Sequence, residues 1–431
     1  MTVASEISRL QTAKSSIKIS IENKGVTVPS ETKLDGYSQL IDTISSGEWA
    51  PDPNWPQNLS TWTPSGGIGF IMSNADYGKA GFIVDTDSAN YTVVINDGTT
   101  DISTTSYASG AQCDVSMARG DGTTYYAVKI TSTSNITRFR VAKPSSVAAS
   151  QSRAPILYLY GNLSTLTTME SMLYATSGGA TCYLLQAAYI LSTTNVTNFN
   201  NAFFGCSNLI SLCGTVFDAT NASNINALFS SCAKLKETPN IINTSNVTNM
   251  SSVFRGCASM KTAPSLNTIS CTVLNDLFAA CAALETPPPT INTSSNPIIY
   301  NMFAGCKMLK SLPSITWPNV TSYNSAISEN YHLPSFTFDL STKSNITSFG
   351  CSYSPAITGV LLPSNAAWGS IAPQVDITND NLERTALIAL FNSLGTVTGK
   401  TIKITGNPGV SSLTAADLLI VTNKGWTVTT T

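Results

Sequence analysis

Charged side chains and histidine are scarce in this 431-residue chain, which limits the partners and the kinds of catalysis that we expect. Asp, Glu, Lys and Arg make up 11% of the residues, the formal net charge is −2, and the one histidine is His332. An average soluble domain has about 25% charged residues. Without a basic block to neutralise phosphates, we expect no nucleic-acid partner and no attachment to anionic membranes. One histidine leaves almost no material for acid–base or triad catalysis.

Long apolar runs and metal-binding motifs are also missing. No stretch approaches the roughly 18 apolar residues of a membrane span, so we expect no membrane insertion. The first residues carry no leader pattern, which predicts no secretory signal and synthesis in a reducing cytosol. The ten cysteines include no CxxC pair, and clustered zinc ligands are absent. We therefore expect buried free thiols, no cofactor and no metal.

A repeat of roughly 25 residues dominates the middle of the chain. Five cysteines recur at gaps of 26, 25, 24 and 25, and a phenylalanine lies three residues before each. These ten residues, which we expect to form the core of the repeat, are Phe203, Cys206, Phe229, Cys232, Phe254, Cys257, Phe278, Cys281, Phe303 and Cys306. Apolar residues also recur seven and four before and three after each cysteine. This spacing falls on one helical face, so we predict a short helix in each unit, buried against its neighbours.

The second half of each unit is predicted to contain a strand. A proline recurs seven residues after four of the cysteines, as at Pro264 and Pro313, and would end the helix. The stretches that follow, such as Ser265-Leu266-Asn267 and Ser314-Ile315-Thr316, have the pattern of strands that stack about 4.8 Å apart in a parallel sheet. Asn-Xaa-Thr triplets such as Asn246-Val247-Thr248 recur at the same period, so we expect their side chains to hydrogen-bond between coils rather than to carry glycans.

The repeat weakens at both ends, as solenoid ends do. A divergent first unit is marked by Met169, Met172 and Leu173, and a late unit has Asn330 in place of the cysteine. We predict an α/β solenoid over 151–365. Residues 366–431 are predicted to form a C-terminal cap with two helices, a strand at 400–404 and Trp426 over the last coil.

The region before the repeat is predicted to hold three further parts. Residues 1–47 contain two short helices with apolar faces that cannot be buried alone, which predicts an attachment or oligomerisation segment, or one that packs on its own chain. Its face residues are Ile7, Leu10, Ile17, Ile21, Tyr37 and Leu40. Residues 48–65 form a Pro/Trp-rich linker. Residues 66–150 alternate as strands at 91–95, 125–130 and 137–141, with a turn at Asn96-Asp97-Gly98, and predict a β-sandwich. Asp85 and Asp87 near that turn could suggest calcium, although a plain hairpin turn is favoured. The fold class expected is mixed α+β.

The repeat block resembles the BspA-type leucine-rich repeats, as in Asn246-Val247-Thr248-Asn249-Met250-Ser251-Ser252-Val253-Phe254-Arg255-Gly256-Cys257. The resemblance covers roughly residues 160 to 360 and implies adhesion or recognition rather than catalysis. Residues 66–150 are similar to a degenerate PKD-type, immunoglobulin-like domain. Residues 4–44 look like N-terminal segments of phage virion proteins, which implies attachment to a particle, and the C-terminal segment resembles caps of phage fibre-like proteins.

These resemblances predict a non-enzymatic phage virion protein, a tail or head fibre or receptor-binding appendage, assembled in the host cytoplasm. It would bind other virion proteins through its N-terminus, self-associate with a trimer favoured, and recognise a host-surface glycan or protein. Possible receptor contacts are Tyr300, Trp317, Tyr323, Tyr331 and Tyr353, with core packing expected for at least half of them. One alternative is a bacterial or protist surface adhesin, which should carry export signals. The other is a glycan-depolymerising spike, which needs two carboxylates, although the acids Asp218, Glu237, Asp276 and Glu285 are scattered in the repeat.

Overall fold

The computed structural model describes residues 67–73, 79–97, 100–116, 125–142, 155–161, 163–174, 182–213, 215–236, 238–295, 297–318, 320, 322–344 and 346–431. The chain divides into two compact units, Met1–Pro53 and Asn54–Thr431, and every described residue belongs to the second. The predicted attachment segment and the linker therefore lie outside the described residues. Within the described part, no helix is long and apolar enough to span a membrane.

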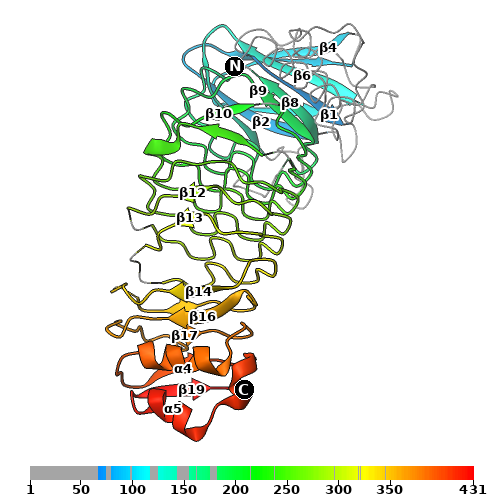
Figure 1. Ribbon diagram of the computed structural model, residues 1–431. Helices are drawn as coiled ribbons and strands as arrows, with labels where there is room; N and C mark the ends of the chain where they lie inside the picture. Colours follow the sequence, from blue (N-terminus) through cyan, green and yellow to red (C-terminus); the bar gives the residue numbers. More distant parts are fainter. Residues whose placement is uncertain are drawn as a thin grey trace, which may run out of the picture. The chain divides into compact units, whose positions relative to one another are not determined.

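The first described strands form two facing β-sheets (Figure 1). A six-stranded sheet has the order β4-β3-β6-β1-β8-β9, and a three-stranded sheet has the order β5-β2-β7. Their bounds are β1 Ile68–Ser73, β2 Lys79–Thr86, β3 Tyr91–Asn96, β4 Asp101–Tyr107, β5 Gln112–Ser116, β6 Tyr125–Ser132, β7 Ile136–Ala142, β8 Ile156–Gly161 and β9 Ala187–Ile190. Phe70 of β1 contacts Phe82 of β2 and Phe139 of β7, with ring centroids 4.7 and 6.2 Å apart, so aromatic burial holds the two sheets together.

Both sheets continue directly into the solenoid. In the larger sheet, β8 pairs antiparallel with β1 and parallel with β9, whose Ala187 bridges Ser211 of the next coil. In the smaller sheet, Arg138 of β7 bridges Thr168, which in turn bridges Asn198. The sheet pair thus covers the first coil and satisfies its backbone groups on two walls, which a bare solenoid end would leave exposed.

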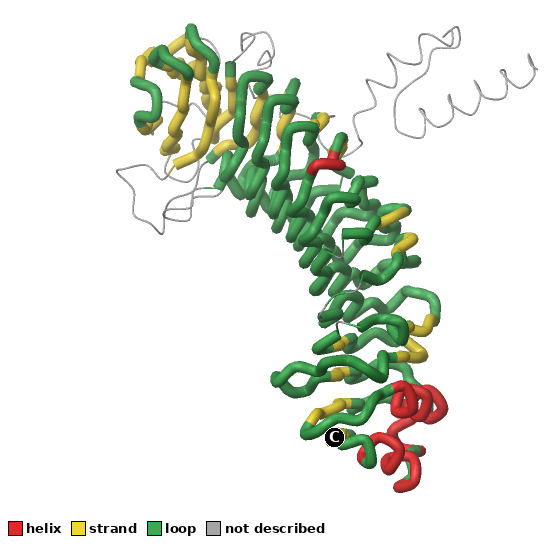
Figure 2. The backbone as a smooth tube through the Cα atoms, turned by 90° about the vertical axis from the view of Figure 1, so that its left-hand side faces the viewer, coloured by secondary structure: helices red, strands yellow, loops and turns green. Residues whose placement is uncertain are grey.

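The repeat region is a β-solenoid of about ten turns, which confirms the predicted solenoid. Its short strands pair in parallel as β10–β11, β12–β13 and β14–β16, with bounds β10 Val216–Asp218, β11 Asn240–Ile242, β12 Thr290–Ile291, β13 Ser314–Ile315, β14 Phe336–Asp339 and β16 Ile357–Leu361. The strands predicted after Pro239, Pro288 and Pro313 are present, whereas 265–267 is not a strand. Most of each coil is loop and turn, as Figure 2 shows.

The short helix predicted in each repeat is wrong, and the described chain is mostly β rather than mixed α+β. Two positions in each coil have left-handed backbone. One lies five residues before the cysteine, as at Ser252 (φ 58°), and the other directly before it, as at Gly256 (φ 74°). An α-helix needs φ near −63° throughout. Backbone N–H groups alternate instead: that of Ala202 bonds to Phe199 within its coil, and that of Phe203 bonds to Leu228 of the next coil. Two linked turns therefore produce the helix-like spacing.

True α-helices occur among the described residues only in the C-terminal cap, as α4 (Arg384–Ser393) and α5 (Ala415–Thr422). They accompany a parallel sheet of β15 Phe349–Gly350, β17 Val375–Asp376, β18 Lys400–Lys403 and β19 Trp426–Thr429. Thr414 and Asp417 form a capping box at the start of α5, and Arg384 of α4 donates two hydrogen bonds to Asp417, at 2.9 and 2.8 Å. Trp426 is buried, and its indole N–H donates to the carbonyl of Gly395 at 3.0 Å.

Candidate functional site

The Phe and Cys residues of the repeat lie in the core and hold the coils together. All ten are fully buried, and the phenylalanine rings stack from coil to coil, for example Phe254 on Phe278 with centroids 5.4 Å apart. Each thiol from Cys232 onwards donates to the carbonyl of the phenylalanine in the preceding coil, as Cys281 does to Phe254 at 3.0 Å. All ten cysteines are free, and burial raises the pKa of the Cys206 thiol far above its ordinary value. These residues therefore carry no reactive chemistry.

A second column, of buried threonines, joins the coils on their strand side. It lies thirteen residues before the cysteine, at Thr193, Thr244, Thr268 and Thr293. The hydroxyl of Thr268 donates to the carbonyl of Asn292 in the next coil and accepts from its N–H, both at 2.8 Å. Thr244 holds Asn267 in the same way, at 3.1 and 2.8 Å. We call this column the threonine clamp.

The threonine clamp ends at Trp317, which occupies its position in the next coil. Thr293 still donates to the carbonyl of Thr316, but an indole at 317 has no hydroxyl with which to hold the following coil. Among the described strands, β13 pairs with β12, whereas β14 pairs with β16 in a separate sheet. We call the place on the strand side between β13 and β14, which do not pair with each other, the seam.

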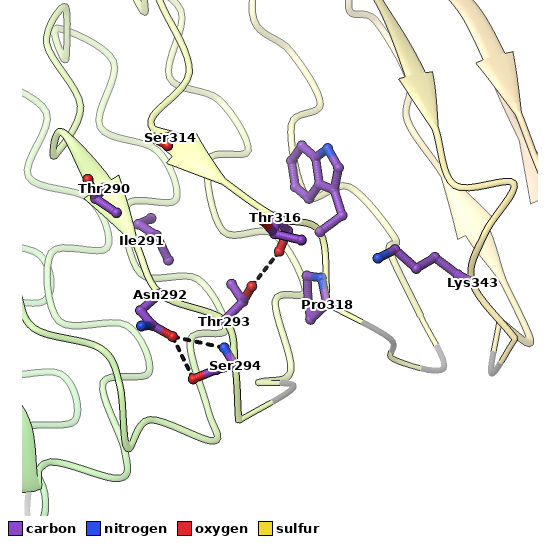
Figure 3. A pocket seen from close by; sticks show the side chains of 10 residues that line it. Thr290, Ile291, Asn292, Thr293, Ser294, Ser314, Thr316, Pro318 and Lys343 are labelled. Carbon is purple, nitrogen blue, oxygen red and sulfur yellow. Dashed lines mark hydrogen bonds between the residues drawn. The ribbon is translucent and has the colours of Figure 1, made fainter.

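A hollow of about 500 Å³ opens at this seam (Figure 3). Two successive coils and a lysine from a third line it, and the lining residues are Thr290, Ile291, Asn292, Thr293, Ser294, Ser314, Thr316, Trp317, Pro318 and Lys343. Figure 3 shows Lys343 reaching across toward Pro318 and Thr316. Asn292 Oδ1 accepts from the backbone N–H of Ser294 at 2.9 Å and from its hydroxyl at 2.7 Å, which orders the floor of the hollow. We call it the seam hollow.

A smaller hollow of about 380 Å³ lies on the same strand side, two coils nearer the N-terminus. It is lined by Ile241, Ile242, Asn243, Thr244, Ser245, Ser265 and Asn267. Both hollows are rich in hydroxyl and amide groups, and neither is lined by an acid, histidine or cysteine.

The five aromatic residues predicted as receptor contacts do not gather at one place. Tyr323 is buried, and its hydroxyl donates to the carbonyl of Pro318, so its ring belongs to the core. Trp317 is half-buried and lines the seam hollow. The other three, Tyr300, Tyr331 and Tyr353, are 44, 47 and 51% exposed, and none of them lines either hollow.

The groups considered for catalysis and metal binding are dispersed among the described residues. No three His, Cys, Asp or Glu side chains come together there in a way that could hold a metal ion. His332 is exposed, with Nδ1 2.8 Å from the carbonyl oxygen of Lys307. Asp87 accepts from the side-chain amide of Asn135 at 2.8 Å, and Asp97 from the N–H of Thr100 at the β3–β4 turn, also at 2.8 Å. Glu237 lies outside the described residues.

The Asn-Xaa-Thr triplets act between coils. Asn246 donates its side-chain N–H to the carbonyl of Thr220 in the preceding coil at 3.1 Å, and Thr248 donates its hydroxyl to that of Ser223 at 3.2 Å. Asn195 bonds to Ser164 in the same manner, at 2.6 Å. These triplets therefore supply hydrogen bonds between neighbouring coils, as their recurrence at the repeat period predicts.

Of the residues that line the seam hollow, the sequence predicts Trp317 as a contact but not Lys343 or most of the others. One signal was available: when the coils are aligned on the cysteine, Trp317 stands where four other coils have threonine. A large aromatic residue in a column of four threonines and one alanine, Ala219, marks a coil that differs from its neighbours.

Comparison with known proteins supports the repeat assignment but assigns no activity. A family model described as "Mycoplasma protein of unknown function, DUF285" matches residues 167–263 and 223–335. The repeat region is thus similar to that family, over coils that supply nearly all of the lining of both hollows. No curated protein and no solved structure matches the chain.

Proposed function

We propose that this protein is a non-catalytic binding protein of a phage particle, a tail or head fibre or receptor-binding appendage, whose solenoid recognises the host surface. The seam hollow supports the binding part of this proposal, because hydroxyl groups, an amide, a lysine and an aromatic ring line an open site. Binding sites of this kind place a few polar groups around apolar surface.

The finer family assignments belong to this proposal. The repeat would be of the BspA type and the first two sheets a PKD-like domain that acts as a spacer. The segment 1–47 would attach the chain to other virion proteins and favour a homotrimer. A matching solenoid would also suit a bacterial or protist surface adhesin, which is the second candidate.

Two measurements test the proposal. Antibody labelling of purified phage particles in negative-stain microscopy should mark a fixed place on the particle. Purified chain with a fluorescent label should bind host cells and compete with particle adsorption. Absence of the chain from purified particles would contradict the virion assignment, and its export to a cell surface would support the adhesin.

A further inference from the structure

We propose that the seam hollow binds an acidic saccharide, with Trp317 against a sugar ring and Lys343 on its carboxylate. This inference deepens the proposed function and rests on it. The side chains that three coils bring together at the seam hollow indicate the class of ligand.

The aromatic wall of the seam hollow is held in place before a ligand arrives. Trp317 stacks on Phe338 of β14, with centroids 4.5 Å apart and planes 29° apart, and meets the edge of buried Tyr323 at 6.5 Å. These contacts fix the indole while it still lines the hollow. A rigid aromatic side chain binds at a low cost in conformational entropy. Its flat apolar face matches the apolar face of a pyranose ring.

The polar wall has spare hydrogen-bonding capacity. Within the described residues, the hydroxyls of Thr290, Ser314 and Thr316 and the side-chain nitrogen of Asn292 make no hydrogen bond. Hydroxyls both donate and accept, and the amide nitrogen donates two protons. That set complements the hydroxyl groups at the edge of a sugar, which also donate and accept.

One positive charge selects the kind of saccharide. Lys343 is the only charged residue that lines the hollow, it is half-buried, and its ammonium has no ion pair or hydrogen bond within the described residues. An ammonium group that has no partner in the protein favours an anionic ligand, because hydrogen bonds between charged groups are strong. A volume of about 500 Å³ suits one or two sugar rings and lies within the range of small-ligand sites.

Calorimetric titration of the full chain with two oligosaccharides tests this inference. One is a tetrasaccharide of alternating glucuronic acid and N-acetylglucosamine, and the other is the neutral tetramer of N-acetylglucosamine. We expect the acidic one to bind about tenfold more tightly, the scale of a hydrogen bond to a charged group. Lys343→Gln should reduce its affinity to that of the neutral probe. Trp317→Phe should weaken both, and Lys261→Gln, on an exposed lysine outside the hollow, should change neither.

The outcomes separate this inference from the proposed function. Binding of neither oligosaccharide, or an unchanged preference in Lys343→Gln, would overturn the acidic-saccharide site. The labelled chain could still bind host cells in either case, which would leave the proposed function standing. Thermal unfolding of each variant verifies folding, and Lys343→Gln, which removes no packed ring, keeps the test decisive if Trp317→Phe unfolds.

Discussion

The Sγ of Cys257 lies 3.2 Å from the carbonyl oxygen of Phe229 in the preceding coil, so a buried thiol donates a hydrogen bond along the solenoid. In the two coils after Cys306, another residue takes the place of the cysteine and makes the equivalent hydrogen bond. Asn330 donates to the carbonyl of Phe303 at 3.2 Å, and Ser354 to that of Ile327 at 2.7 Å. The column therefore holds a small or medium polar side chain, and cysteine is one of several residue types that occur there.

Loss of that donor should weaken the solenoid. Cys257→Ala leaves the carbonyl of Phe229 without this bond and opens a small cavity, so we expect a loss of about 1–3 kcal/mol in the free energy of unfolding. Cys257→Ser keeps a donor and should lose less. Urea unfolding followed by circular dichroism measures both. Equal stability of the alanine variant and the wild type would show that the thiol contributes only volume.

In the folded protein, we expect only one cysteine thiol to react rapidly with a thiol reagent. Nine of the ten thiols are buried, and Cys213 alone is partly exposed. Burial also raises the pKa of the Cys281 thiol to about 12, which suppresses the reactive thiolate. We expect Ellman's reagent to titrate one thiol rapidly in the native chain and ten after denaturation. Cys213→Ser should remove the rapid phase, whereas several rapid thiols would mean that the coils open readily.

The residue directly before the cysteine has left-handed backbone, so exchanging glycine and alanine there should shift the midpoint of thermal unfolding in opposite directions. Gly256 has φ 74°, and Ala280 occupies the equivalent place at φ 59°. A side chain in this region costs roughly 1 kcal/mol. Ala280→Gly should therefore raise the midpoint of thermal unfolding, and Gly256→Ala should lower it. No packing clash complicates the second change, because a Cβ at Gly256 would lie 3.5 Å from its nearest neighbour. A fall in both midpoints would contradict a role for backbone strain.

Stability should fall as pH rises because of Asp380. Burial raises the pKa of this carboxyl to about 8, although N–H donation from Ser354 at 2.9 Å and the thiol of Cys351 at 3.3 Å favour the charged form. The unfolded value is about 3.9. The folded state therefore holds a proton that the unfolded state releases. Below about pH 4, Asp380 is protonated in both states and the stability it contributes is fully present. Between about pH 4 and pH 8 the free energy of unfolding falls by about 1.4 kcal/mol per pH unit.

Asp380→Asn tests this assignment, because Asn330 and Asn407 show that asparagine fits the position in other coils. The variant should flatten the pH dependence of the unfolding free energy between pH 4 and 8. Asp339→Asn serves as the control: hydrogen bonds from Ser341 lower the pKa of Asp339, so its removal should leave that slope in place. An unchanged slope in Asp380→Asn would assign the pH dependence to other groups.

Much of this protein could be predicted from the spacing of a few residues. The recurrence of Phe254, Cys257 and their counterparts identifies a solenoid, because residues at one period of about 25 can only be buried against each other. The alternating pattern of 91–95 predicts β3, and the predicted strand at 400–404 corresponds to β18. Periodicity alone could not distinguish a helix from two linked turns, since both place residues three and four apart on one side. The left-handed angles at Ser252 and Gly256 distinguish them.

By itself, then, the sequence determined which side chains enter the core, because burial of apolar residues depends on their spacing along each coil. Only the tertiary structure decided what lies outside that core. In the folded chain, the hydroxyl of Thr293 donates to the carbonyl of Thr316, and Trp317 follows at the end of the threonine clamp. Folding also brings Lys343 from a later coil to the same hollow. Residues that meet there are 53 positions apart, from Thr290 to Lys343. Their proximity comes from the stacking of coils, a long-range geometry that no local pattern encodes.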